Sequence, residues 1–196
     1  MKKLLLIAAI LLLSAPTGAA AAPERSITLL LTAGSGNDVF DVKLSQDGRS
    51  YIIDSLSPLE AGGGICVHEE GSPHALTCEA AAIGGFEVFA GAGDDSVIIS
   101  PRIMVPATIR GGSGNDRLRG GGGPDKIIGG PGADVLSGEG GDDWLFGGPG
   151  RDWLFGGPGS DRLVGGPGPD WLNGGAGEDT ERTGAGDTVG PKPPPA

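Results

Sequence analysis

Residues 111–182 decide the fold of this chain and read GGSGNDRLR GGGGPDKII GGPGADVLS GEGGDDWLF GGPGRDWLF GGPGSDRLV GGPGPDWLN GGAGEDTER. They consist of eight consecutive nonapeptides with no insertion. The sixth position is always aspartate: Asp116, Asp125, Asp134, Asp143, Asp152, Asp161, Asp170 and Asp179. The eighth position is apolar in the first seven units: Leu118, Ile127, Leu136, Leu145, Leu154, Leu163 and Leu172. One apolar residue per unit predicts a solenoid in which every unit contributes one side chain to a continuous core.

The last unit departs from this pattern. Its eighth residue is Glu181, which would bring a charge into the core. Terminal repeats of a solenoid are usually atypical, so we expect the stack to end here.

The eight units follow the pattern G-G-x-G-x-D-x-U-x and resemble the repeats-in-toxin (RTX) family, also called haemolysin-type calcium-binding repeats. The resemblance covers residues 111–182. It implies an all-β fold, a parallel β-roll or β-solenoid in which each coil uses two nonapeptides. It also implies that several Ca²⁺ ions sit between coils along both edges.

The residue types fit this chemistry on their own. Glycine permits positive φ and close backbone approach, and Ca²⁺ takes about six to eight oxygen ligands from carbonyls and carboxylates. Besides the eight aspartates, the expected metal-site residues are glycines of the first and fourth positions: Gly111, Gly114, Gly120, Gly123, Gly129, Gly132, Gly147, Gly150, Gly156 and Gly159. Aspartates of units n and n+2 would stack at about 4.8 Å. Eight units then allow six shared sites, such as Asp116 with Asp134.

Stacked carboxylates repel each other in the absence of a cation. We therefore expect the metal-free repeats to be expanded and calcium to fold them. The alternative is a glycine solenoid that needs no metal, which leaves the regular aspartates unexplained. Glu139, in place of a second-position glycine, and Arg151, beside Asp152, predict weaker sites in their loops.

Two degenerate copies of the pattern lie upstream, AGSGNDVFD from Ala33 and AGAGDDSVI from Ala90. Their aspartates, Asp38 and Asp95, are candidate additional metal ligands. Short apolar or alternating runs around them predict strands at 27–31, 39–44, 51–53, 86–89, 97–99 and 105–109. We expect residues 22–110 to form a β-rich region that caps the roll, and residues 183–196 to be a proline-rich tail.

The chain begins with the layout of a secretory signal peptide over residues 1–21. Lys2 and Lys3 precede an apolar run that is shorter than the roughly 20 residues of a membrane span. An uncleaved anchor or a lipoprotein is the alternative. Removing the leader changes the formal charge from −11 to −13, because two lysines and no acids are lost. Such a polyanion favours cation binding in a secreted, extracellular protein and disfavours nucleic-acid partners and membrane insertion.

The two cysteines, Cys66 and Cys78, would form a disulfide in an oxidising compartment. Two buried thiols are the alternative. A zinc site is disfavoured because only His68 and His74 are nearby.

Positions seven and nine of each unit should point to solvent. One face would carry Val135, Trp153, Phe155 and Trp171, and the other Ile128, Trp144, Phe146 and Val164. Self-association or binding of a surface polymer through Trp144, Trp153 and Trp171 is one interpretation. Aromatic pairs that only stabilise a narrow sheet are the other.

No catalytic motif is present in the sequence. H-E-x-x-H and G-x-S-x-G are both missing, and two histidines offer little general-base chemistry. We therefore predict a protein that is not an enzyme. Two functions remain: a calcium-binding structural protein that folds on export, or a calcium-dependent adhesion or self-association module.

Overall fold

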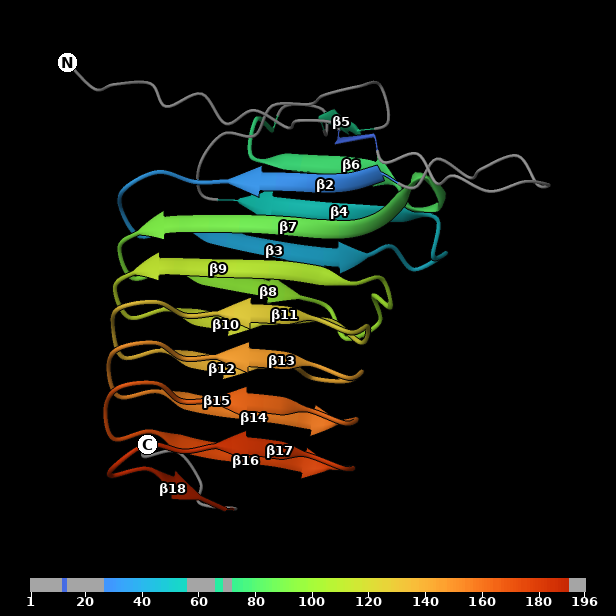
Figure 1. Cartoon of the computed structure of the whole chain (residues 1–196). Helices are drawn as coiled ribbons and strands as arrows, with labels where there is room; N and C mark the ends of the chain where they lie inside the picture. The colour runs from blue at the N-terminus through green and yellow to red at the C-terminus, as the bar shows by residue number, and fades with distance from the viewer. Residues whose placement is uncertain (1–11, 14–26, 56–65, 69–71, 191–196) are drawn as a thin grey trace.

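Two β-sheets lie face to face along the whole length of the molecule, and the chain winds between them from the N-terminal to the C-terminal end (Figure 1). The structure is a computed structural model that describes residues 12–13, 27–55, 66–68 and 72–190. The predicted signal peptide, apart from Leu12–Leu13, lies outside these residues, as does the end of the predicted tail.

The first sheet has eight strands in the order β1-β2-β7-β9-β11-β13-β15-β17. Their bounds are β1 Leu12–Leu13, β2 Ile27–Thr32, β7 Ile83–Ala92, β9 Ala107–Ser113, β11 Lys126–Ile128, β13 Trp144–Phe146, β15 Arg162–Val164 and β17 Thr180–Arg182. From β2 onward all pairs are parallel.

The second sheet has ten strands in the order β18-β16-β14-β12-β10-β8-β3-β4-β6-β5. Their bounds are β18 Thr188–Val189, β16 Trp171–Ala176, β14 Trp153–Pro158, β12 Val135–Ser137, β10 Arg117–Arg119, β8 Ser96–Ile99, β3 Val39–Leu44, β4 Ser50–Ser55, β6 Ala75–Glu79 and β5 Cys66–His68. The strands from β18 to β3 are parallel, and β4, β6 and β5 add antiparallel pairs.

Successive nonapeptides alternate between the two sheets, so that one coil uses two units. Leu118 therefore pairs with Leu136 in the second sheet, and Ile127 pairs with Leu145 in the first. The molecule is a parallel β-solenoid, as the sequence predicted. The pairing interval of eighteen residues follows directly from two units of nine.

A single apolar column fills the space between the sheets. The eighth-position side chains Leu118, Ile127, Leu136, Leu145, Leu154, Leu163 and Leu172 are each at most 1% exposed. This core continues upstream through larger residues, including Phe40, Phe86 and Ile109. The short three-residue strands fold because each buries one aliphatic side chain against the coils above and below it.

Both sheets run without interruption from the repeats into the N-terminal region. Strands β2, β7 and β9 extend the first sheet, and β3 and β8 extend the second. Beyond β3 the antiparallel strands β4, β6 and β5 close the second sheet at this end, where Cys66 and Cys78 form the predicted disulfide. Strands β5 and β6 were not among the strands predicted from the sequence.

The C-terminal end differs from the expectation that the stack stops at Glu181. The first sheet does end with β17, but the second continues to β18, where Val189 pairs with Leu172. Glu181 is tolerated opposite Leu163 because it is only half-buried and its Oε1 accepts the backbone N–H of Gly174 at 2.7 Å.

Helical structure is limited to the 3₁₀ turn η1 (Ala80–Ala82) in the part of the chain that the structure describes. No helix there has the length and hydropathy required to cross a membrane.

Candidate metal centre

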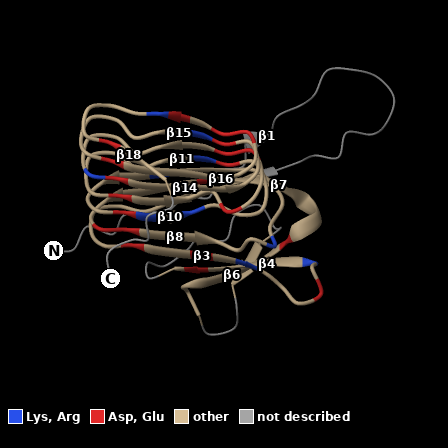
Figure 2. Cartoon of the chain, turned by 90° about the horizontal axis from the view of Figure 1, so that it is seen from below, with Lys and Arg blue, Asp and Glu red and all other residues tan. Residues whose placement is uncertain are grey.

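The repeat aspartates form two columns at opposite edges of the coils. Acidic residues gather at both ends of the flattened coils when the molecule is viewed from below (Figure 2). One column precedes the strands of the first sheet and contains Asp125, Asp143, Asp161 and Asp179. The other precedes the strands of the second sheet and contains Asp116, Asp134, Asp152 and Asp170.

Each column is held by the same hydrogen bond, repeated at every coil. The backbone N–H of one aspartate donates to Oδ1 of the aspartate one coil further on, as from Asp116 to Asp134 at 2.8 Å and from Asp125 to Asp143 at 2.8 Å. The remaining distances in the repeats are 2.8 to 3.0 Å. These bonds account for one carboxylate oxygen of each accepting aspartate, whereas Oδ1 of Asp125, the first of its column, accepts the N–H of Ala107 at 2.7 Å.

The two upstream aspartates belong to the same ladder. Asp38 donates its N–H to Asp95 Oδ1 at 2.7 Å, and Asp95 donates to Asp116 Oδ1 at 2.9 Å. The degenerate copies at Ala33 and Ala90 therefore extend the second-sheet column by two coils.

The second carboxylate oxygen of most column aspartates is buried without a hydrogen-bond donor. These oxygens are Oδ2 of Asp95, Asp116, Asp134, Asp143, Asp152, Asp161 and Asp170. The side chains carrying them are at most 3% exposed. A buried, unpaired anionic oxygen is costly unless a cation or donor compensates it. Asp125, first in its column, differs because Gly121 N–H donates to its Oδ2 at 2.6 Å.

Burial also raises the pKa of these carboxyl groups. It raises the pKa of Asp125 and Asp134 to about 6 and that of Asp143 and Asp152 to about 7. Repulsion from the neighbouring carboxylate in the column raises the pKa of Asp134, Asp143 and Asp152 further. Without a cation the columns therefore favour protonated carboxyl groups.

The first-position glycines leave room for these carboxylates. A Cβ built on Gly111 would overlap Asp116 Oδ2 and lie 2.9 Å from the carbonyl oxygen of Gly129. The same clash with the Oδ2 of the unit's own aspartate recurs at Gly120, Gly129, Gly138, Gly147, Gly156, Gly165 and Gly174. Any side chain at this position would displace the carboxylate.

The fourth-position glycines bring carbonyl oxygens close to the same aspartates. Gly132 has a φ of 156°, and a Cβ built on it would overlap Gly114 O and lie 3.3 Å from Asp134 Oδ1. Gly114, Gly150 and Gly159 likewise have positive φ, but Gly123 does not. A backbone carbonyl and a carboxylate thus border a space that only glycine leaves open.

The donor set of the columns is therefore mixed. Among the described residues, no three His, Cys, Asp or Glu side chains converge on one point. Carboxylates supply one oxygen-bearing group per coil, and backbone carbonyls lie beside them. Hard oxygens of this kind fit Ca²⁺, and the orphaned Oδ2 atoms are negative charges that such an ion would compensate.

The two departures noted in the sequence leave the columns intact. Glu139 adopts a φ of 77°, and its carboxylate turns outward to Arg119 at 2.9 Å. Arg151 is exposed, while Asp152 Oδ1 still accepts the N–H of Asp134 at 2.9 Å.

One column residue was not expected from the sequence. Asp187 accepts the N–H of Asp170 at 3.0 Å on its Oδ1, only seventeen residues further on. The signal was the segment Gly184–Val189, which reads GAGDTV and lacks one residue of a full unit. A strict nine-residue period does not identify Asp187, because this residue lies seventeen and not eighteen residues after Asp170.

The outer faces carry the predicted aromatic residues, with one correction. Trp144 is 47% exposed and Phe146 is 39% exposed on the first sheet, as expected. Trp171, expected to face solvent, is only 5% exposed. It packs against Trp153 and Phe155, with ring centroids 5.5 and 4.9 Å away, and its strand is flanked by β18.

Comparison with known families gives matches in the repeat region, all within residues 108–189. The family model described as the RTX calcium-binding nonapeptide repeat matches in four copies, at residues 108–136, 119–154, 128–163 and 155–189. No curated protein and no solved structure matched the chain. The matched segments span residues 108–189 and coincide with the coils whose aspartates form the two columns. Residues 108–189 of this chain are thus RTX calcium-binding repeats wound into a β-roll.

Proposed function

We propose that this chain is a secreted structural protein whose β-roll folds when Ca²⁺ binds between its coils. The observation that carries the proposal is the set of seven buried Oδ2 atoms without a donor, arranged at regular intervals along two columns. A cation next to each would offset the cost of burying these charges, so binding energy would become folding energy.

The ions would be shared by aspartates of successive coils within one column. Six such pairs lie in the nonapeptides: Asp116 with Asp134, Asp125 with Asp143, Asp134 with Asp152, Asp143 with Asp161, Asp152 with Asp170, and Asp161 with Asp179. The ladder adds Asp38 with Asp95, Asp95 with Asp116, and Asp170 with Asp187. Carbonyl oxygens of the glycine loops would complete each coordination shell.

The N-terminal region would cap the roll. Strands β4, β6 and β5 add antiparallel pairs at that end of the second sheet, and the disulfide closes the β5–β6 hairpin. Capping covers the open end of a solenoid, which otherwise exposes backbone donors and apolar side chains.

Export and a non-catalytic role complete the proposal. Proteins with RTX repeats are typically secreted, and the family is generally structural rather than catalytic. The first residues carry the layout of a signal peptide. Extracellular calcium is near millimolar, in the range at which weak extracellular calcium modules are loaded.

Circular dichroism during a calcium titration of the purified protein tests the folding mechanism. In chelator we expect a weak β signal, and in millimolar calcium a cooperative gain of β structure. Magnesium at the same concentration is the control, since its smaller octahedral shell does not suit a large carbonyl-lined loop. Full β structure in chelator, unchanged by calcium, would overturn the proposal.

A role in binding another molecule is a second candidate. It is favoured by the exposure of Trp144 and Phe146 on the same strand of the first sheet, because neighbouring exposed apolar side chains often mark an interaction site.

A further inference from the structure

The outer face of the first sheet carries positive charge on an acidic protein. Outward side chains of strands β9 to β17 include four cations, Arg110, Lys126, Arg162 and Arg182, and no acid. The chain as a whole has a formal charge of −11. None of these four cations takes part in an ion pair in the part of the chain described. We call this surface the basic face.

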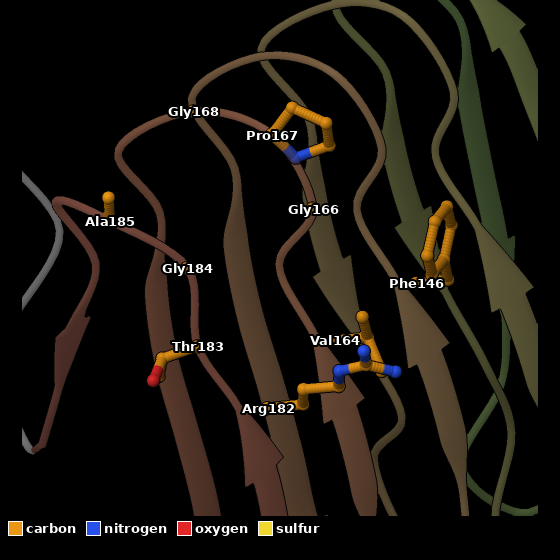
Figure 3. Close-up of a pocket in the computed structure, with 9 residues that line it drawn as sticks. All are labelled: Phe146, Val164, Gly166, Pro167, Gly168, Arg182, Thr183, Gly184 and Ala185. Atoms are coloured by element: carbon orange, nitrogen blue, oxygen red, sulfur yellow. The ribbon is translucent and has the colours of Figure 1, made fainter.

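Two hollows on the basic face meet at Phe146. The larger, about 580 Å³, lies where the chain turns from β17 toward β18, beside Val164 and the loop Gly166–Gly168 (Figure 3). The smaller, about 180 Å³, is lined by Lys126, Ile128, Trp144 and Phe146. Neither hollow is lined by an acidic residue. Together they form a shallow groove across β11, β13, β15 and β17.

Two cations of the basic face, Lys126 beside the smaller hollow and Arg162 on the next strand but one, lie on either side of one aromatic residue. Trp144 pairs with Lys126 on one side and with Arg162 on the other. Lys126 Nζ lies 4.9 Å from the centre of a Trp144 ring, and Arg162 Cζ lies 5.7 Å from it. Cation–π contacts order both side chains before any ligand arrives, which lowers the entropy cost of binding an anion.

This arrangement selects among ligands. Because the two cations approach Trp144 from opposite neighbouring strands, a neutral sugar or a nucleic-acid base would have to displace them to stack on its ring. Two identical basic faces repel each other, so symmetric pairing of two copies through this surface is disfavoured. A carboxylate-bearing chain instead meets Lys126 and Arg162 two coils apart, at about 4.8 Å per coil. Arg182 lies one coil beyond Arg162 and two residues further along the strand, in register with Val164.

We propose that the basic face binds a linear polysaccharide that bears carboxylates. Lys126, Arg162 and Arg182 bind the carboxylates, and Ile128, Phe146 and Val164 contact the sugar rings. Guanidinium groups suit this role because they bind carboxylates in a bidentate manner.

The inference rests on the proposed function, because calcium must first fold the β-roll that carries the basic face and compensate the negative charge of the rest of the chain. The six pairs within the nonapeptides alone, at two charges per Ca²⁺, would bring twelve positive charges to a chain whose formal charge is −13 once the leader is lost. The metal-free chain would repel a polyanion, and the calcium-loaded chain would have almost no net charge left to do so.

Isothermal titration calorimetry with hyaluronan oligosaccharides in millimolar calcium tests the proposal; neutral dextran of equal length is the ligand control. The test variant is Lys126→Gln/Arg162→Gln/Arg182→Gln. The matched control, Arg49→Gln/Arg102→Gln/Arg117→Gln, removes the same charge from exposed arginines elsewhere. We expect hyaluronan affinity to fall at least about tenfold in the test variant and to stay within about twofold in the control.

Circular dichroism with calcium is run on all three proteins to separate the two proposals. Absence of calcium-dependent folding in the unsubstituted protein would count against the proposed function. Calcium-folded protein that ignores hyaluronan, binds dextran equally well, or loses binding equally in both variants would overturn the polysaccharide site alone. Binding only to single-stranded DNA or to anionic vesicles would also overturn the polysaccharide site. So would a dimer, seen by light scattering in the unsubstituted protein, that is absent in the test variant.

Discussion

The backbone N–H of Asp116 donates to Oδ1 of Asp134 at 2.8 Å, while Oδ2 of Asp134 is buried with no donor. One oxygen of the carboxylate therefore connects two coils, and the other remains an uncompensated charge. The same division recurs along both columns. Backbone hydrogen bonds therefore stabilise the roll, while the buried carboxylates destabilise it until a cation binds.

Asp143→Asn and Asp142→Asn form a matched pair in one loop. Asp143 is 3% exposed and lies in the column, whereas Asp142 is exposed. Asn at 143 keeps an acceptor for Asp125 N–H but removes the buried charge. We expect more β structure in chelator, about tenfold weaker calcium binding at that edge, and little change for Asp142→Asn. Calorimetric calcium titration and circular dichroism measure both effects. Equal effects of the two substitutions would contradict the column assignment.

The metal-free roll should become more stable as pH falls. Asp143 and Asp152 have a folded pKa of about 7 against an ordinary value of 3.8, so the folded state binds more protons than the unfolded state between these values. Stability is then fully present below about pH 4 and is lost as pH rises through about 7. The β signal by circular dichroism in chelator across this range measures the trend. A β signal that rises with pH in chelator would contradict it.

Gly148→Ala should destabilise the roll while Glu139→Ala is tolerated, although both positions are second in their units. A Cβ on Gly148, whose φ is 116°, would overlap the carbonyl oxygen of Gly130. Glu139 already holds a side chain at positive φ and loses its ion pair with Arg119 and a hydrogen bond from the Ser137 hydroxyl. We expect a loss of at least about 2 kcal/mol for Gly148→Ala and less than about 1 kcal/mol for Glu139→Ala, by chemical denaturation in calcium. Similar losses at both sites would show that the loops do not stack as described.

Asp187→Ala should remove the last calcium site without unfolding the roll. Its Oδ1 accepts Asp170 N–H at 3.0 Å at the end of the second sheet, where no further coil depends on it. We expect the calcium stoichiometry to fall by about one ion and the β signal to stay nearly unchanged. Glu178→Ala, an exposed acid in the preceding unit, is the control. An unchanged stoichiometry for Asp187→Ala would exclude this residue from the metal column.

Much of the fold could be predicted from the sequence, because a regular nine-residue repeat fixes which residues of successive coils lie in register. Leu118, Leu136 and Leu154 had to align once two units made a coil, and the aspartates had to form two columns for the same reason. Upstream, the glycine-aspartate signature at Asp38 and Asp95 was enough to mark ladder members despite the broken period.

What local pattern could not predict depends on contacts between distant segments. Trp171 is buried because it packs against Trp153 and Phe155 and its strand is flanked by β18, a strand that a missing residue had hidden. The groove depends on Phe146 joining two hollows, and the ordered cations on Trp144 lying between Lys126 and Arg162. A periodic sequence determines which residues stack, because the interval alone sets the register. Only the tertiary structure decides how an end is covered, because that depends on breaks in the period, and how neighbouring outward side chains pack, because that depends on their rotamers.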